Sequence, residues 1–144
     1  MIYTKMTNRA IKLAYQAHHG QLDKSGLPYV FHPFHLAEQI KTEETVTVAL
    51  LHDVVEDTDY SLEDLRKMGF SDGVLDALAL MTHDPSVPYM EYIKCLKRNP
   101  IARSVKLVDL THNSDLSRLP VVTEKDLERA EKYRKAINLL EQGE

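Results

Sequence analysis

The chain has 144 residues, of which 43% are hydrophobic, with a formal net charge of -4 and a pI near 6.0. This length and apolar content support one domain with a buried core over residues 1–144, and nothing in the sequence indicates a second domain. The mildly acidic balance argues against a dedicated nucleic-acid-binding protein, for which a basic face is expected.

Apolar residues recur at helical spacing along almost the whole chain, which predicts an all-α protein. The first stripe covers residues 10–17 and is closed by Gly20, in the position of a helix stop. Pro33 fits the first turn of a short helix that runs to about residue 40. Thr42 is then placed to cap the next helix.

The second half of the chain carries further helix-start signals, namely Ser61 with Asp64 as a capping box, Ser71, Pro88, Asn99 followed by Pro100, and Thr123. The corresponding helices extend to about residues 81, 97, 114 and 141 for the last four starts. Only Tyr29-Val30-Phe31 resembles a strand, and it is too short to build a sheet. The expected architecture is a compact bundle of about seven or eight helices.

The segment Ala49-Leu50-Leu51-His52-Asp53-Val54-Val55-Glu56-Asp57-Thr58 places four polar groups in an otherwise apolar helix. At about 100° per residue, His52, Asp53, Glu56 and Asp57 share an arc of roughly 140°. Leucines and valines take the remaining surface, so we expect the polar stripe to face a cavity rather than bulk water. Burying three carboxylates and an imidazole is costly unless something compensates them, and a divalent cation would do so.

A second polar cluster lies in Tyr29-Val30-Phe31-His32-Pro33-Phe34-His35. His32 directly precedes a helix-starting proline, and the restricted backbone there suits a ligand that must point in one direction. On local sequence alone, His32 is equally well interpreted as a metal ligand or as an ordinary histidine. For His35, a solvent-facing or hydrogen-bonded histidine is the better interpretation.

A third cluster lies in Lys106-Leu107-Val108-Asp109-Leu110-Thr111-His112-Asn113. Lys106, Asp109 and Asn113 fall within an arc of roughly 60°. A carboxylate at Asp109 in a buried helix needs a cation or several donors, and Lys106 supplies that cation if the pair is a plain salt bridge. His112 shares its direction with apolar positions, which predicts a core histidine with one hydrogen-bond partner rather than a ligand.

Two features bear on the compartment. Cys95 is the only cysteine, so an internal disulfide is impossible and a reducing compartment is favoured. The first eight residues hold no apolar core of signal-peptide length, and the longest apolar runs fall far short of the roughly 20 residues of a membrane span. We therefore expect a soluble cytoplasmic protein that binds neither nucleic acid nor membrane, with its oligomeric state left open by the sequence.

Together the three clusters resemble the HD superfamily of metal-dependent phosphohydrolases, and more narrowly the RelA/SpoT-type (p)ppGpp pyrophosphohydrolase domain and its small stand-alone alarmone hydrolase relatives. The similar segments cover most of the chain in order: Ala17-His18-His19-Gly20-Gln21, Lys24-Ser25-Gly26-Leu27-Pro28-Tyr29, His32-Pro33, residues 50–58, Lys106-Leu107-Val108-Asp109 and His112-Asn113. One His-Asp dipeptide alone is weak evidence, but the ordered set, with the Glu-Asp pair three residues after the dipeptide, is strong evidence for the resemblance.

The resemblance implies an all-α fold that holds one divalent ion between two imidazoles and two carboxylates. The implied metal ligands are His32, His52, Asp53 and Asp109, and the implied catalytic pair is Glu56 and Asp57. Mixed nitrogen and oxygen ligands without a thiolate suit Mn²⁺ better than structural Zn²⁺, and manganese is the usual ion in family members of this type. The metal would polarise the phosphate while the catalytic pair deprotonates a water molecule. Pyrophosphate would then leave the ribose 3′ position of a guanosine tetra- or pentaphosphate, the alarmone of the stringent response.

Two departures from the family pattern leave the substrate open. Asp23 stands where the family commonly has an arginine against the nucleobase, and Asp115 stands where it often has another arginine. Each change replaces a cation by an anion beside a highly charged nucleotide, although Asp23 could also accept hydrogen bonds from a base edge. Lys24, Arg118 and Lys94 are candidates to compensate the lost charge.

Three hypotheses follow: an alarmone hydrolase, an HD phosphohydrolase of a different nucleotide or phosphoester, and a non-enzymatic nucleotide-sensing module. The intact Glu56-Asp57 pair counts against the third, because a sensor needs no water-activating carboxylate. We expect Lys24, Ser25 and Asn113 to contact the substrate, since the chain has no Gly-x-x-x-x-Gly-Lys loop to cradle phosphates. Synthesis of the nucleotide is not expected, because the synthetase and regulatory domains of longer relatives have no counterpart.

Overall fold

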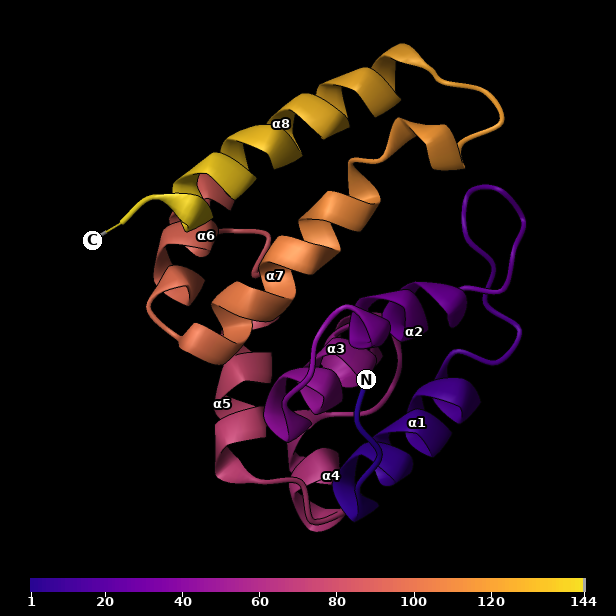
Figure 1. Cartoon of the computed structure of the whole chain (residues 1–144), viewed down its shortest axis with the longest axis vertical. Coiled ribbons are helices and arrows are strands. Elements are labelled where there is room, and N and C mark those ends of the chain that lie inside the picture. Colours follow the sequence, from indigo (N-terminus) through magenta and orange to yellow (C-terminus); the bar gives the residue numbers. More distant parts are fainter. Residues whose placement is uncertain (144) are drawn as a thin grey trace.

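Nine helical segments follow one another along residues 1–143, which are the residues that the computed structural model describes (Figure 1). Their bounds are α1 Lys5–Ala17, α2 Phe31–Glu38, α3 Glu43–Asp57, α4 Leu62–Lys67, α5 Asp72–Met81, α6 Tyr89–Lys97, α7 Pro100–Asn113, the 3-10 helix η1 Leu116–Arg118, and α8 Glu124–Glu141. Over this range the only β-type pairing is one isolated bridge between Leu22 and Pro28. The predicted all-α bundle of seven or eight helices is confirmed.

The predicted helix starts are confirmed, and five of them depend on a side chain that caps the backbone amide three residues later. The side-chain oxygens of the N-caps accept a hydrogen bond from the N3 amide in α3, α4, α5, α7 and α8; these caps are Thr42, Ser61, Ser71, Asn99 and Thr123. Pro100 occupies the first turn of α7, where its missing N–H costs nothing. These interactions are local, so the sequence alone reveals them.

The strand-like interpretation of Tyr29-Val30-Phe31 is wrong. Phe31 is the first residue of α2, and its amide donates to the Pro28 carbonyl at 3.2 Å. His32 therefore lies inside the helix rather than in the extended conformation expected before a proline. Its direction is set by the helical turn that it belongs to.

Helix α3 is the centre of the fold and packs against α1, α2, α5 and α7 (Figure 1). Its residues from Val46 to Val54 are all buried, as expected for a helix surrounded by others. Helix α7 packs on both α2 and α3, while α8 lies across α6 and α7. This arrangement brings together α2, α3 and α7, the three helices that carry the polar clusters.

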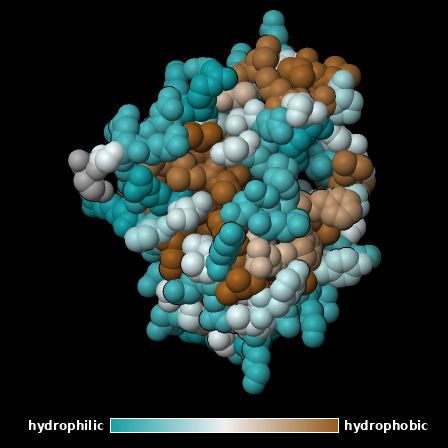
Figure 2. Space-filling view, viewed as in Figure 1, coloured by the Kyte–Doolittle hydropathy of each residue, from teal (hydrophilic) through white to brown (hydrophobic). Residues whose placement is uncertain are grey.

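The molecular surface is mixed in character, with apolar residues gathered in a few places (Figure 2). One such place is the start of α8, where Val121 of the preceding segment is 74% exposed and Leu127 of the helix is 53% exposed. Within residues 1–143 there is no helix whose length and hydropathy suit a membrane crossing.

Candidate metal centre and adjoining pocket

Three buried side chains from three helices point at one another. His32 of α2, His52 of α3 and Asp109 of α7 each offer a ligand atom, and these atoms all lie within 4.8 Å of one another. The His32 Nε2 atom is 2.9 Å from Asp109 Oδ1, and the His52 Nε2 atom is 3.5 Å from the same oxygen. Two imidazoles and a carboxylate so arranged fit a divalent cation.

The tautomer of His52 is the one that a metal ligand needs. Its Nδ1 lies 2.7 Å from the Ala49 carbonyl oxygen, which can only accept, so Nδ1 carries the proton and donates. The buried Nε2 atom then holds a lone pair and has no hydrogen-bond partner, although Asp53 Oδ2 is 3.0 Å away. A lone pair facing carboxylate oxygens is repulsive unless a cation lies between them, so this orphaned nitrogen fits an ion at the centre of the cluster.

Without a metal, a proton on His52 serves as that cation. Burial opposes the charged ring, but the neighbouring Asp53 and Asp109 carboxylates outweigh burial and raise the pKa of His52 well above its usual value. The two carboxylates therefore favour a positive charge at the position of the His52 Nε2 atom.

His32 is oriented by His112. The two Nδ1 atoms are 2.7 Å apart, so one proton lies between them. When His32 carries that proton, its Nε2 presents a lone pair to the cluster; when His112 carries it, His32 Nε2–H donates to Asp109 instead. Burial, followed by the positive charge of Arg118, lowers the pKa of His112 to about 4, so this ring is neutral.

The predicted hydrogen-bond partner of His112 is thus present, but the ring is half-buried rather than part of the core. It stacks on His32, with ring centroids 5.0 Å apart, and on the exposed His35 at 4.1 Å. His35 is the solvent-facing histidine that the sequence predicted. The three rings form a column from the cluster to the surface.

The two interpretations of Asp109 are both realised, on different oxygen atoms. Lys106 Nζ lies 2.9 Å from Oδ2, so the predicted salt bridge exists. The Oδ1 atom faces the histidines and accepts a hydrogen bond from Asn113 Nδ2 at 3.0 Å. Burial opposes ionisation, but Lys106 and both histidines hold the pKa of Asp109 well below its usual range.

Asp53 lies beside the three-residue cluster. Its Oδ2 is 3.0 Å from His52 Nε2 and 3.9 Å from His32 Nε2, and it accepts a hydrogen bond from the Tyr29 hydroxyl. The Tyr29 ring is itself packed against His18, at a centroid distance of 5.1 Å. Tyr29 therefore fixes the direction of a carboxylate that touches both imidazoles.

Tyr29→Phe is expected to weaken divalent-ion binding by about 10- to 100-fold, because Asp53 loses the hydroxyl that orients it. The measurement is titration of Mn²⁺ into the metal-free protein by calorimetry. Tyr15→Phe is the matched control, since Tyr15 is an exposed residue of α1. Equal Mn²⁺ affinities in the two variants would show that the Tyr29 hydroxyl does not support metal binding.

The predicted polar stripe on α3 is divided between the interior and the surface, and Glu56 lines a cavity together with Asp109. His52 and Asp53 are buried, whereas Glu56 and Asp57 are exposed because α3 ends at Asp57 and its last turn reaches the surface. Glu56 Oε1 accepts a hydrogen bond from the His83 amide at 2.9 Å. Partial burial, with the nearby Asp53 and Glu56 carboxylates, raises the pKa of Asp57, which makes it a better proton acceptor near neutrality.

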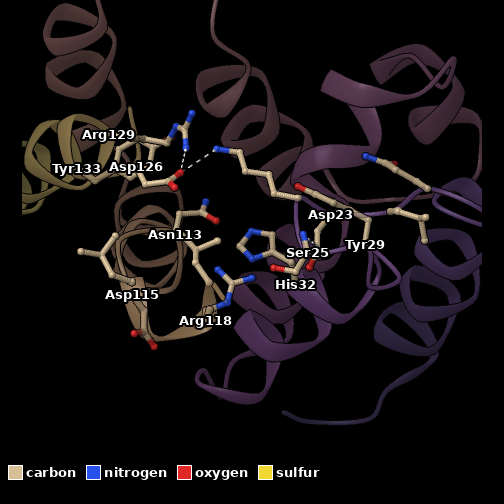
Figure 3. A pocket seen from close by; sticks show the side chains of 15 residues that line it. Asp23, Ser25, Tyr29, His32, Asn113, Asp115, Arg118, Asp126, Arg129 and Tyr133 are labelled. Atoms are coloured by element: carbon tan, nitrogen blue, oxygen red, sulfur yellow. Dashed lines mark hydrogen bonds and ion pairs between the residues drawn. The ribbon is translucent and has the colours of Figure 1, made fainter. Parts of the chain in front are cut away.

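A pocket of about 340 Å³ opens beside the cluster and includes Tyr29 and His32 in its wall. One wall is the loop between α1 and α2, and the other consists of the end of α7, η1 and α8 (Figure 3). Lys24, Ser25 and Asn113, the residues predicted to contact a substrate, all line this pocket.

The sequence analysis missed the contribution of α8. Asp126, Arg129 and Tyr133 line the pocket, and they follow one another at the three- and four-residue spacing of a single helix face. Asp126 pairs with Arg129 at 3.1 Å and lies 3.8 Å from Lys24 Nζ, across the pocket mouth. This helical spacing was the only sign in the sequence that the three residues share a face, and many other charged residues of α8 have the same spacing.

The two residues that depart from the family pattern each hold a turn together. Asp23 Oδ1 accepts hydrogen bonds from the amides of Ser25 and Leu27, at 2.9 and 3.0 Å, in a loop where Gly26 has a φ of 80°. Asp115 Oδ1 accepts from the Ser117 amide and hydroxyl, and these bonds lower its pKa. Both carboxylates are thus satisfied without a ligand.

The expected compensating cations are only partly correct. Lys24 and Arg118 line the pocket. Lys94 instead lies on α6 and pairs with Glu91 at 3.4 Å, so its predicted role was wrong. Arg118 also donates to the His112 carbonyl at the end of α7, at 2.9 Å.

The chain is similar in sequence to several relatives of known name. The chain is 33% identical over 150 residues to a GTP pyrophosphokinase of Streptomyces coelicolor, an alignment that covers 95% of this chain and 17% of the relative. It is 38% identical over 115 residues to a guanosine-3′,5′-bis(diphosphate) 3′-pyrophosphohydrolase of Haemophilus influenzae, covering 70% and 17%. With the bifunctional (p)ppGpp synthase/hydrolase SpoT of Escherichia coli it shares 41% identity over 68 residues, covering 44% and 10%.

The chain thus spans less than a fifth of the length of these curated relatives. No protein-family model matches it. Among solved structures, a metazoan orthologue of SpoT that hydrolyses ppGpp superposes with a TM-score of 0.76 at 26% identity, covering 98% of this chain and 88% of that one.

Proposed function

Because the chain belongs to the RelA/SpoT-type hydrolase domains of the HD superfamily, we propose that it removes pyrophosphate from the 3′ position of guanosine 3′,5′-bis(diphosphate). The observation that supports this most directly is the cluster of His32, His52 and Asp109, set between a nucleotide-sized pocket and two carboxylates at the end of α3. The pyrophosphohydrolase of Haemophilus influenzae and the metazoan SpoT orthologue give the substrate class.

We propose His32, His52, Asp53 and Asp109 as ligands of one divalent ion, with Mn²⁺ as the best match to two imidazoles and two carboxylates. When bound, the ion supplies Lewis-acid polarisation of the phosphate and a lowered pKa for water. Lys106 and Asn113 hold the Asp109 carboxylate in place, and Tyr29 holds Asp53.

Asp57 takes the proton of the attacking water in this proposal, since its pKa is raised, and Glu56 orients the water from its anchored position on the His83 amide. The water oxygen forms a bond to the phosphorus next to the ribose. The bond between that phosphorus and the 3′ oxygen breaks, the 3′ oxygen takes up a proton, and pyrophosphate leaves.

The charges of the pocket favour a second candidate, an HD phosphohydrolase of a nucleotide that carries fewer phosphates. Three carboxylates and three cations line the pocket: Asp23, Asp115 and Asp126 against Lys24, Arg118 and Arg129. A pocket of balanced charge gives a highly charged tetraphosphate less electrostatic attraction than a basic pocket does.

A substrate panel tests both candidates. The protein, loaded with Mn²⁺, is incubated with guanosine 3′,5′-bis(diphosphate) and with guanine and adenine nucleotides that carry a single 3′ or 2′ phosphate, and phosphate and pyrophosphate are detected separately. We expect pyrophosphate and GDP from the first compound, with loss of turnover in a chelator. Turnover of a monophosphorylated nucleotide alone would establish the second candidate. Binding without turnover of any compound would establish a sensing module.

Asp23→Asn is expected to raise kcat/KM for the guanosine tetraphosphate several-fold at low salt. Asparagine keeps the oxygen that accepts from the Ser25 and Leu27 amides, so the loop is retained while the charge that opposes the phosphates is removed. The gain should shrink at high ionic strength, because salt screens a charge that solvent reaches, and Asp23 is only partly buried.

A nucleotide of lower charge decides the role of Asp23. For such a nucleotide, Asp23→Asn should raise kcat/KM only slightly, because fewer phosphates are repelled. A fall in kcat/KM for every guanine nucleotide would show that Asp23 recognises the base. Unchanged kinetics across the panel would show that its charge plays no part in substrate choice.

A further inference from the structure

A second cavity, of about 260 Å³, lies among α6, α7 and α8 on the far side of Asn113 from the larger pocket. Glu56 and Asp109 belong to its wall, so it adjoins one of the two carboxylates at the end of α3 and the metal cluster. Asn113 and Tyr133 line this cavity and the larger pocket alike. The two spaces therefore meet at these two side chains.

Two carboxylates, Glu56 and Asp109, and two ammonium groups, Lys106 and Lys132, line this cavity. Glu56 accepts from the His83 amide and Asp109 from Lys106, so the groups that remain free are mainly donors. The Tyr89 hydroxyl is buried and has no hydrogen-bond partner within residues 1–143, which is costly for a phenol. Lys132 Nζ lies 4.4 Å from the centroid of the Tyr89 ring, and no carboxylate of the described chain lies within 4 Å of it. Lys106 Nζ donates one hydrogen bond to Asp109 and lies 5.5 Å from the centroid of the Tyr92 ring.

A ligand for these groups must be an anion with several acceptor oxygens. An ammonium has three donors, and a phenol that faces an anion donates its proton, so Lys106, Lys132 and Tyr89 together match a phosphate-type group. A cationic ligand would meet the Lys132 ammonium, which no carboxylate of the described chain offsets within 4 Å, whereas Lys106 is already paired with Asp109.

We propose that this cavity, the release chamber, binds the pyrophosphate that leaves the substrate; this inference rests on the proposed function. Hydrolysis adds the water oxygen to the phosphorus and leaves the 3′ oxygen on the ribose, so the product is a free anion formed beside Glu56 and Asp109. The release chamber lies directly next to that point, and within it the Lys132 ammonium and the Tyr89 hydroxyl have no partner among the described side chains that would compete with an anion. Pyrophosphate enters it without passing the nucleoside, which occupies the larger pocket on the other side of Asn113.

Binding of inorganic pyrophosphate to the metal-free protein, kept in a chelator and followed by phosphorus NMR, tests the release chamber without any turnover. Lys132→Met should weaken binding by about five- to tenfold, because one charge-assisted contact is lost. Tyr89→Phe should weaken it by about two- to fivefold, and it removes an atom that has no partner in the fold. Lys135→Met is the matched control, since Lys135 is an exposed residue of the same helix outside both cavities.

The same variants should raise the inhibition constant of pyrophosphate in the metal-loaded enzyme, in the same order. Equal pyrophosphate affinity in wild type and Lys132→Met, or an equal loss in Lys135→Met, would overturn the proposal. If Lys132-dependent binding is found while no 3′-diphosphate nucleotide is hydrolysed, the anion site stands and the proposed function fails. If hydrolysis occurs and pyrophosphate binding is independent of Lys132 and Tyr89, only the release chamber fails.

Discussion

Asp109→Ala is expected to bind no divalent ion and to lose about 3–5 kcal/mol of stability, because the change removes a ligand and leaves the Lys106 ammonium without its partner. The loss of stability should be measurable by thermal unfolding in a chelator. The loss of the ion should be measurable as metal content per chain after loading with Mn²⁺. The loss of the ion reflects Oδ1, which faces the histidines, and the loss of stability reflects Oδ2, which pairs with Lys106.

Two further variants separate these contributions. Lys106→Met removes the salt bridge but keeps the Oδ1 atom that faces the histidines, so it should still bind the ion. Asp76→Ala controls for the loss of an exposed carboxylate and should change neither quantity. A metal content near one in Asp109→Ala would refute the ligand assignment and leave Asp109 and Lys106 as a plain salt bridge.

Combining Glu56→Gln with Asp57→Asn should lower turnover by about 100-fold or more while the metal content stays near one, since a positioned base contributes about that much. Glutamine keeps an oxygen that accepts from the His83 amide, and Asp57 is exposed, so neither change disturbs the fold. The measurement pairs steady-state hydrolysis of the guanosine tetraphosphate with metal analysis of the same sample.

Asp59→Asn is the matched control, because Asp59 is an exposed carboxylate just beyond α3 that lines neither cavity. Its turnover should equal that of the wild type. Near-normal turnover in the double variant, with full metal content, would mean that another group deprotonates the water.

The helices were predictable because their starts are decided within four residues. Thr42, Ser61 and Thr123 each satisfy an amide three positions on, and that interaction is visible in the sequence. Tyr29-Val30-Phe31 shows the limit of this reasoning, because β-branched and aromatic residues there suit a strand locally. The packing of α2 on α3 overrides that preference.

The site was predictable only in part from local patterns. The polar stripe of α3 pointed to His52 and Asp53, but nothing local links them to His32 or Asp109; only the resemblance to a family did so. The part of α8 in the pocket left no distinct signal, since Asp126 and Arg129 look like any exposed ion pair of a charged helix. The exposure of Glu56 and Asp57 depends on where α3 ends against its neighbours, which periodicity does not reveal.

The contact between His32 and Asp109 spans 77 residues of sequence, and this separation has a consequence for the order of folding. A chain that emerges from the ribosome presents His32, His52 and Asp53 long before α7 exists, so an early intermediate has three of the four proposed ligands and lacks Asp109. Closing so long a loop is slow relative to forming single helices. Ion capture is therefore expected late, and metal should change the last phase of refolding while leaving the earlier ones unaltered.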